Sequence, residues 1–478
     1  MKQPVIIFLF SLSLFSSYGQ SFVIKSIRDF GAKADGRTND QQAFEKAAAY
    51  FNKRGGRGRL IIPKGMYLVG LQDFTRVQNG KPAYYGHDVL HLTHVQNMEI
   101  VGKQGAVLRY ADSLYFGAFD PGTGKIYPNQ KYFVKYAYAA FIGHCIRIDS
   151  SEKVTIRNLE LDGNNMGAIL GGVYGDKGRQ LPHYGVFVLN SRNVLVDNLY
   201  VHHFCLDGIS VSNKSGNQQD LIVLKNCRFT YNSRQGLSWV GGNGLTARDC
   251  QFNHTGQGAF NSPPGAGVDI EAEAGPIRNG VFTGCSFVDN KGVGLVADNG
   301  NSASCRFTNC SFWGTEAYAI WVNKPSFTFQ DCKIYGSFVH GYNASADTEA
   351  TRFISCFFED KPYEGRQPYG RFLVESNGRK RVSFTNCRFV SNKMKLLWIQ
   401  IDAKLAPEEK YQFRDCQFTI NNDNLPKNDF VAVVRGMRYE DCTFEYTRTA
   451  AKEKHYYLNS CCANFNVDAG GNTIIYKH

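Results

Sequence analysis

Short stretches in which apolar and polar residues alternate recur through the second half of the chain. Five of them read DGISVS (207–212), QGLSWV (235–240), GVDIEA (267–272), VGLVAD (293–298) and YAIWVN (318–323). Side chains of a β-strand point alternately to its two faces, so each stretch predicts a strand with one buried and one outward face. In GVDIEA, Val268 and Ile270 take the buried face.

A second kind of strand contains a cysteine in a fixed context, in which a short polar residue or glycine precedes the Cys and an apolar residue follows two positions later. Nine of the 14 cysteines, spaced 22 to 35 residues apart, occupy this slot: Cys227, Cys250, Cys285, Cys310, Cys332, Cys356, Cys387, Cys416 and Cys442. Upstream the same slot holds Met98, Leu159 and Leu199. A position that accepts Met, Leu and Cys is an interior packing position, so we predict buried thiols there, not disulfides. Cysteines outside the slot, among them Cys461 and Cys462, could still pair.

A repeat of this length, built from short strands and without helical periodicity, indicates a solenoid. We therefore predict an all-β fold, a parallel β-helix in which each rung pairs with the next at about 4.8 Å. The repeat predicts the β-helix over residues 61–445, with loop insertions near 110–141 and 163–184. Residues 446–478 lack the repeat and are predicted to form a C-terminal cap.

The start of the chain has a different pattern. Residues 1–19 combine an early Lys, an apolar run and small residues, as a signal peptide does, which predicts a secreted or periplasmic protein. Residues 20–60 are predicted to cap the solenoid with a helix that buries one apolar face: Phe44, Ala47, Ala48 and Phe51. No later segment reaches the roughly 20 apolar residues of a membrane span. We expect no membrane association, and capped ends favour a monomer.

The passage DFGAKADGRTND, followed by the predicted helix, a Gly-Gly pair, an apolar strand and PKGMY, covers residues 29–67. It closely resembles the N-terminal part of the pectate lyase superfamily of right-handed parallel β-helices, which includes polygalacturonases and many lyases. The resemblance implies a right-handed solenoid and a carbohydrate ligand. It does not determine the reaction, because this fold carries several chemistries.

The strongest candidate for chemistry is the stretch GVDIEAE. Because Val268 and Ile270 face inward, Asp269, Glu271 and Glu273 are predicted to point outward together. Groups predicted nearby come from the same strand positions and from the preceding turns: Ser238, Asp298, His202, His203, Asp207, Arg234 and Gln235. We expect these groups to converge on one stretch of surface.

A comparison with polygalacturonases narrows the mechanism. Those enzymes carry N-T-D, D-D and G-H-G on consecutive rungs, and only Asp207 matches, as the first Asp. Arg234 and Gln235 replace the Asp pair, and Ala266 replaces the His. The resemblance therefore does not imply the polygalacturonase mechanism here.

Three functions remain open for an exported polysaccharide-degrading protein, and among them a lyase is slightly favoured. In a lyase, Asp269, Glu271 and Glu273 would bind Ca²⁺, Arg234 would clamp a substrate carboxylate, and His202 or His203 would act as base. In a hydrolase, Asp269 and Glu271 would be the two carboxylates, about 6.5–7 Å apart along a strand. In the third, the β-helix binds glycan or serves a structural role without catalysis.

Charge bears on the ligand. The net charge of +12 favours an anionic partner, and the basic residues show no nucleic-acid motif. We expect an anionic, uronate-type polysaccharide and no nucleic acid. Candidate substrate-binding residues beyond the acids are Gln235, Ser238, Asp298, the stacking residue Trp321, and Lys177, Arg179 and His183 of the second insertion.

Overall fold

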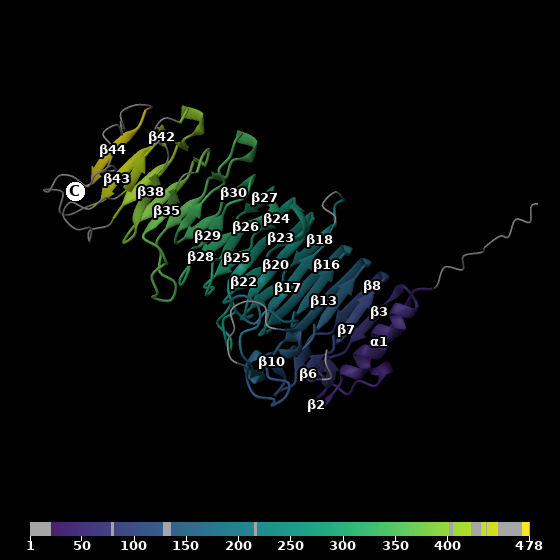
Figure 1. Cartoon of the computed structure of the whole chain (residues 1–478). Helices are drawn as coiled ribbons and strands as arrows, with labels where there is room; N and C mark the ends of the chain where they lie inside the picture. The colour runs from purple at the N-terminus through teal and green to yellow at the C-terminus, as the bar shows by residue number, and fades with distance from the viewer. Residues whose placement is uncertain are drawn as a thin grey trace, which may run out of the picture.

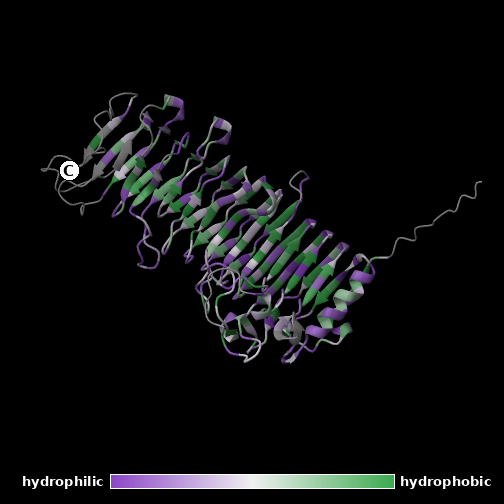
Figure 2. Ribbon diagram, viewed as in Figure 1, coloured by the Kyte–Doolittle hydropathy of each residue, from purple (hydrophilic) through white to green (hydrophobic). Residues whose placement is uncertain are grey.

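The computed structural model describes residues 21–477, except 78–80, 128–134, 215–217, 378, 401–404, 422–431, 436 and 448–470. The chain winds into one long solenoid with the helix α1 at one end and the strand β44 near the other (Figure 1). Hydrophobic residues concentrate on the strands along the solenoid, and hydrophilic residues on its loops (Figure 2). The predicted parallel β-helix is confirmed.

One long face of the solenoid is a parallel sheet, the twelve-strand sheet, to which each rung contributes one strand. In spatial order its strands are β7 (Leu90–Thr93), β12 (Ile146–Asp149), β15 (Val186–Leu189), β17 (Asp207–Ser212), β20 (Gln235–Asn243), β23 (Ala266–Arg278), β26 (Leu295–Ser302), β29 (Ile320–Val322), β32 (Phe338–His340), β35 (Phe372–Asn377), β38 (Lys395–Gln400) and β41 (Ala432–Arg435). All five alternating stretches of the sequence contribute strands to this sheet.

The rest of the wall is the twenty-seven-strand sheet, to which most rungs contribute two strands. Its strands in chain order are β1 (Val23–Ser26), β2 (Asp35–Asn39), β3 (Gly56–Ile62), β4 (Gly65–Val69), β8 (Gln96–Gly102), β9 (Ala106–Tyr110), β13 (Glu152–Asp162), β16 (Arg192–His202), β18 (Ile222–Lys225), β19 (Arg228–Thr230), β21 (Leu245–Arg248), β22 (Gln251–Asn253), β24 (Gly280–Thr283), β25 (Ser286–Val288), β27 (Cys305–Thr308), β28 (Ser311–Trp313), β30 (Phe327–Gln330), β31 (Lys333–Tyr335), β33 (Arg352–Ile354), β34 (Phe357–Glu359), β36 (Ser383–Thr385), β37 (Arg388–Ser391), β39 (Tyr411–Arg414), β40 (Gln417–Ile420), β42 (Met437–Glu440), β43 (Thr443–Thr447) and β44 (Thr473–Lys477). The strand β44 pairs with β43, so a strand from the predicted C-terminal cap extends the sheet.

The cysteine slot lies where the chain bends between the two strands of a rung in the twenty-seven-strand sheet. The residue before each of the nine slot cysteines has a positive φ of 52° to 64°. Gly, Asn and Asp adopt this left-handed conformation most easily, which explains the recurring Asn, Asp or Gly. The bend turns the thiol and the residue two positions later into the core.

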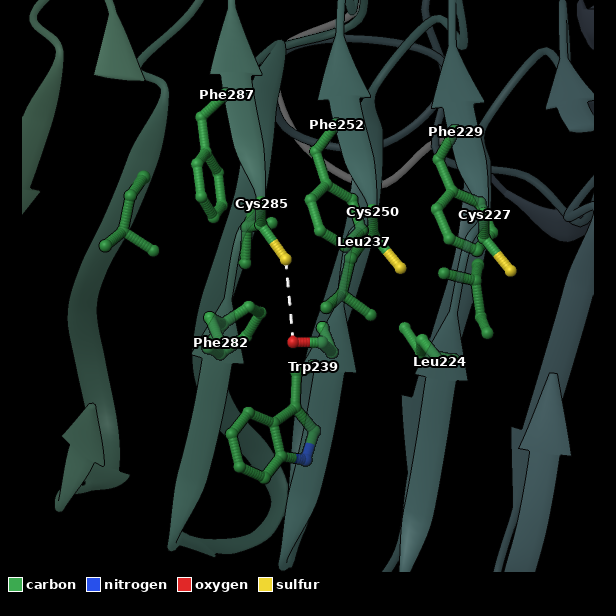
Figure 3. Close-up of a cluster of buried hydrophobic side chains, with 14 of the residues drawn as sticks. Leu224, Cys227, Phe229, Leu237, Trp239, Cys250, Phe252, Phe282, Cys285 and Phe287 are labelled. Carbon is green, nitrogen blue, oxygen red and sulfur yellow. Dashed lines mark hydrogen bonds between the residues drawn. The ribbon is translucent and has the colours of Figure 1, made fainter. Parts of the chain in front are cut away.

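The interior of the rungs drawn in Figure 3 is filled by these thiols and by aromatic and aliphatic side chains. Phe229 stacks on Phe252 with 5.5 Å between ring centroids, and the Cys285 thiol donates to the carbonyl of Ala247 at 3.5 Å. All twelve cysteines among the described residues are free and buried, so the predicted unpaired thiols are confirmed there. Cys461 and Cys462 lie outside the described residues.

The helix α1 (Gln41–Lys53) covers the first rungs. Its predicted apolar face is buried, with Phe44, Ala47 and Phe51 at 0% exposure and Ala48 at 4%. The helix packs on β3 and β7 and closes the end of the core, as the pattern predicted.

Both insertions are folded against the early rungs. Residues 110–141 contribute β10 (Tyr115–Ala118), η3 (Tyr136–Tyr138) and β11 (Ala139–Ala140), while 163–184 contribute η4 (Asn165–Gly167) and β14 (Ile169–Leu170). The strand β10 pairs with both β11 and β14, so the insertions form a small sheet together. A separate hairpin joins β5 (Gln72–Val77) to β6 (Lys81–Gly86).

Candidate active site

A buried ion pair lies at the start of β17 and the turn before β20. The Arg234 guanidinium donates from Nε to Asp207 Oδ1 at 2.9 Å and from Nη2 to Oδ2 at 2.6 Å. Burial raises the pKa of Asp207, and Arg234 offsets part of that rise. Burial would lower the pKa of Arg234, but Asp207 holds it above its usual range. Two of the donor groups of Arg234 are therefore already used within the protein.

Asp269 lies one rung further, on β23, and is only 5% exposed. The side-chain amide of Gln235 donates to its Oδ2. Burial raises the pKa of Asp269 well above its usual range, and the charge of Glu271 raises it further, whereas Arg234 lowers it. Asp269 therefore keeps its proton at pH values where an exposed aspartate is ionised.

Glu271 and Glu273 have wetter surroundings. Glu271 is half-buried and accepts a hydrogen bond of 2.8 Å from Asn299 Nδ2, while Glu273 is exposed. Partial shielding of its carboxyl group from solvent, and then the charge of Glu271, raise the pKa of Glu273. The register between β23 and β26 shifts after Asp269, so the regular alternation predicted from the sequence ends near Ile270.

The insertion 163–184 adds Tyr184, which the sequence reasoning did not assign a role. Burial raises the pKa of Tyr184 to about 12, Arg234 lies next to it, and its ring stacks on His144 at 4.6 Å and 2°. Burial lowers the pKa of His144 to about 4. His144 and Asn299 were also missed, because neither lies in a repeat position that signals contact with this site.

The predicted substrate-binding residues are spread over several environments. Asp298 is exposed and its charge acts on Asp269, Ser238 is 2% exposed, and Lys177 is exposed. Trp321 is outward and half-buried, with its ring 4.6 Å from that of His340.

Two residues of the insertion have structural contacts that the sequence did not predict. The Arg179 guanidinium donates to the carbonyl of Gly171 at 2.7 Å and lies 4.9 Å from the ring of Phe260. His183 is fully buried and accepts a hydrogen bond from the amide of Cys205 at 3.0 Å. These contacts hold the insertion against the rungs and leave His183 inaccessible to substrate, which corrects its predicted role.

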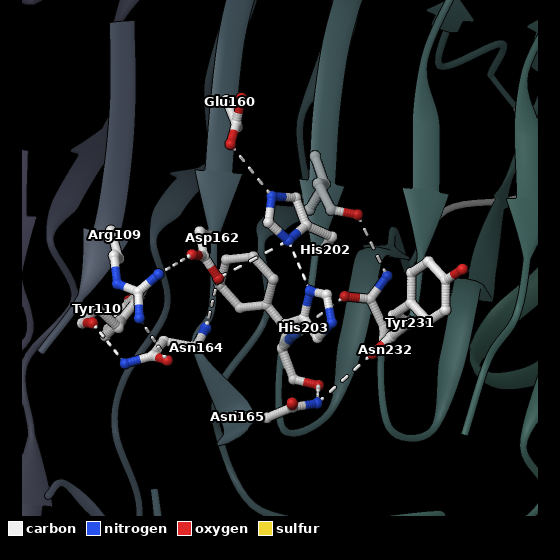
Figure 4. A network of polar contacts seen from close by, with 12 residues as sticks. Arg109, Tyr110, Glu160, Asp162, Asn164, Asn165, His202, His203, Tyr231 and Asn232 are labelled. Atoms are coloured by element: carbon white, nitrogen blue, oxygen red, sulfur yellow. Dashed lines mark hydrogen bonds and ion pairs between the residues drawn. The ribbon is translucent and has the colours of Figure 1, made fainter. Parts of the chain in front are cut away.

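His202 and His203 do not join Asp269. They end the strand β16, where His202 lies opposite Asp162 of β13, and their Nδ1 atoms are 2.7 Å apart (Figure 4). Asp162 also accepts a hydrogen bond of 3.0 Å from Arg109. The sequence placed both histidines near the acids because they precede Asp207, but their side chains belong to a separate cluster on the other side of the turn.

The described residues bring one set of three metal-ligating side chains within 4.8 Å of one another, and it is Asp162, His202 and His203. Asp269, Glu271 and Glu273 form no such set in this part of the chain. Burial, which raises the pKa of Asp269, also disfavours the ionised form that a Ca²⁺ ligand needs. The Ca²⁺ site stays a prediction.

Comparison with known proteins agrees with the fold. Residues 144–334 match the family model described as a right handed beta helix region. Together with the parallel rungs, this match confirms the predicted fold, a right-handed parallel β-helix.

Among individual proteins, the chain is similar to the uncharacterized protein YclG of Bacillus subtilis (strain 168), with 22% identity over 306 residues. The matched region is 58% of this chain and 45% of YclG, so the chain matches less than half of that relative's length. In the described part of the chain, no helix is long and apolar enough to cross a membrane.

Three solved structures are similar in shape. The A-module of mannuronan C-5 epimerase AlgE6 from Azotobacter vinelandii has a TM-score of 0.45 at 13% identity, covering 88% of this chain and 98% of that one. The Dettilon tailspike protein has a TM-score of 0.44 at 9% identity, with coverage of 95% and 68%. The enzymatically active domain of bacteriophage CBA120 tailspike protein 2 has 0.40 at 11%, with coverage of 90% and 48%.

Proposed function

We propose that this protein is a glycoside hydrolase that acts on a polysaccharide, with Asp269 as general acid and Glu271 as the carboxylate partner. The observation that carries the proposal is the burial of Asp269, which raises its pKa well above the usual range. Hydrolysis of a glycosidic bond needs a carboxylic acid that still holds its proton near the working pH, next to a second carboxyl group.

The surroundings of the two acids suit these two roles. Asp269 is shielded from solvent, which disfavours its charged form. Glu271 is half-buried and accepts a hydrogen bond of 2.8 Å from Asn299, which orients its carboxyl group for a role as base or nucleophile. A pair of carboxyl groups with contrasting environments is the usual arrangement for dividing acid and base work.

Contacts with sugar hydroxyl groups can come from Gln235. Its amide nitrogen is used by Asp269, while its Oε1 is buried without a hydrogen-bond partner. A buried acceptor without a partner costs free energy, and a substrate hydroxyl that donates to it would recover that cost. The net charge of +12 and the exposed Lys177 favour an anionic glycan.

A lyase mechanism is less well supported. It needs a free cationic clamp and a base, but Asp207 occupies Nε and Nη2 of Arg234. The histidines suggested as base, His202 and His203, contact Asp162 instead. The predicted signal peptide, residues 1–19, lies outside the described residues, and export of the enzyme is part of the proposal.

The test is to incubate the protein with a panel of uronate and neutral polysaccharides and to measure new reducing ends together with the ultraviolet absorbance of unsaturated products. We expect reducing ends without that absorbance, and we expect Asp269→Asn and Glu271→Gln each to lower the rate by roughly 10²–10⁴-fold. Glu273→Gln, two residues further along the same strand, is the matched control and should lose far less.

Unsaturated products would show that the protein cleaves its substrate by elimination and not by hydrolysis. Full activity in both acid variants would refute the assignment of the site. If no glycan of the panel is cleaved but one binds, the site is a glycan-binding site without catalysis.

A further inference from the structure

The cluster of Asp162, His202 and His203 lies on the other side of the turn from the acids and takes no part in the proposed hydrolysis. From its geometry we propose that it is a binding site for one divalent transition-metal ion of the Zn²⁺ type, held by the Nδ1 atoms of both histidines and a carboxylate oxygen of Asp162. These ligand atoms all lie within 4.8 Å of one another.

The distances are close to those of a metal site. The two Nδ1 atoms are 2.7 Å apart, and Asp162 Oδ1 is 3.7 Å from His202 Nδ1. Two ligands at about 2.1 Å from a tetrahedral ion are about 3.4 Å apart, so the imidazoles need to separate by only a fraction of an ångström. The proton that one imidazole now shares with the other would leave when the ion binds.

The surroundings hold each ligand in place. His202 is nine-tenths buried, and its other ring nitrogen, Nε2, has no hydrogen bond but lies 3.5 Å from a carboxylate oxygen of Glu160. A carboxylate behind a ligating histidine orients the ring and strengthens it as a ligand. Figure 4 shows Glu160 next to one ring nitrogen of His202, and Asp162 and His203 next to the other.

The carboxylate ligand is supported in the same way. Asp162 Oδ2 is bound by Arg109 at 3.0 Å, and Oδ1 accepts a hydrogen bond from the amide of Asn164 at 2.9 Å. Oδ1 retains a lone pair on the side of the histidines. Side chains and amides that would hold the metal ligands in place therefore already surround both the histidine and the aspartate.

The types of ligand atom determine which ion the site would bind. Two imidazole nitrogens and one carboxylate oxygen suit Zn²⁺ and the neighbouring ions Co²⁺ and Ni²⁺, whereas Ca²⁺ takes six to eight oxygens. Because Asp162 and His202 face each other on adjacent strands, a bound ion would link two rungs. His203 is only half-buried, which leaves the ion a route from solvent.

The experiment uses the full chain without a histidine tag, treated with a chelator and then titrated with ZnCl₂ by calorimetry, with CaCl₂ as the second titrant. We expect one Zn²⁺ per chain, no Ca²⁺ at this site, and a higher melting temperature with Zn²⁺. CoCl₂ in place of zinc should give the visible absorption of a cobalt ion with nitrogen and oxygen ligands.

His203→Asn is the main variant, because His203 has a φ of 56° and Asn tolerates this backbone conformation. His94→Asn is the matched control, since His94 is exposed and has a φ of 54°. We expect His203→Asn to weaken Zn²⁺ binding by more than a hundredfold, Glu160→Gln to weaken it by about 10–100-fold, and His94→Asn to leave it unchanged.

Absence of Zn²⁺ binding by the unmodified chain would overturn the proposal, as would equal binding by the His203 and His94 variants. Circular dichroism of each variant establishes that it is folded. All of these readouts are independent of glycan cleavage, so the metal site and the hydrolase can fail separately.

Discussion

Two polar clusters flank the turn that joins β16 to β17, and each contains an arginine paired with an aspartate. At Asp207 the carboxylate is fully buried and the Arg234 side chain is 18% exposed. At Asp162 the corresponding values are 12% for the carboxylate and 39% for Arg109. The same pair of residue types thus occurs in a dry and in a wet environment on the two sides of one turn.

The difference shows what each cluster can do. In the dry cluster, Asp207 and Arg234 neutralise each other and lie near Asp269, an acid whose pKa is raised by burial. In the wet cluster, Arg109 uses one carboxylate oxygen and leaves the other facing two histidines. The first arrangement suits proton transfer, and the second suits an ion.

The largest expected effect separates the two ion pairs. Arg234→Ala leaves the Asp207 carboxylate buried without a partner and should lower the free energy of unfolding by about 3–5 kcal/mol. Arg109→Ala removes a partly exposed pair and should cost about 1 kcal/mol or less. Urea denaturation of both variants measures the contrast.

A double variant, Asp207→Asn with Arg234→Gln, provides the control. Removing both charges avoids the unpaired carboxylate, so the double variant should be more stable than Arg234→Ala alone. Equal losses for the two arginine variants would show that the two clusters are not electrostatically different.

A smaller effect concerns recognition in the dry cluster. Gln235→Leu removes the buried Oε1 that has no partner and also the amide that donates to Asp269. It should lower kcat/KM by about tenfold, and KM should rise if a sugar hydroxyl donates to Oε1. Gln257→Leu is the matched control, because Gln257 donates to the main-chain carbonyl of Asp289 outside the site. Steady-state kinetics that are the same for both variants would remove Gln235 from substrate binding.

The repeated part of this fold could be predicted from the sequence because each rung obeys the same local rule. The residue before Cys227, like the residue before each of the other slot cysteines, has a positive φ. The thiol and the apolar residue two positions after it then point inward. Because this rule depends only on neighbouring rungs, the strands and the buried thiols could be predicted from it. The helix α1 could be predicted from its own apolar face.

The candidate site could be predicted only in part. The acids of GVDIEAE were found from alternation, but the register shift after Asp269 and the contact between Glu271 and Asn299 are irregularities that no repeat encodes. The separation of His202 and His203 from the acids depends on a change of direction within the turn. Tyr184 reaches Arg234 only because an insertion folds back over the rungs.

The smallest expected effect is a change in the free energy of unfolding with pH. Because burial and Glu271 raise the pKa of Asp269 in the folded protein, the folded state binds more protons than the unfolded chain above the ordinary Asp pKa of 3.8. The free energy of unfolding should therefore fall as pH rises from about 3.8 toward the raised pKa. Asp269→Asn removes this loss, so its melting temperature relative to the unmodified protein should increase with pH.

The pKa of Asp35 is shifted in the opposite direction from that of Asp269. Main-chain amides of Thr38 and Arg37 lower the pKa of this exposed carboxylate to about 2, so it contributes stability above its unfolded pKa that is lost as pH falls through about 2. Asp35→Asn should therefore be less stable than the unmodified protein at neutral pH. Melting curves of both variants from pH 2 to pH 8 measure the two trends. Parallel curves for the two would contradict the raised pKa of Asp269 on which the proposed acid catalysis depends.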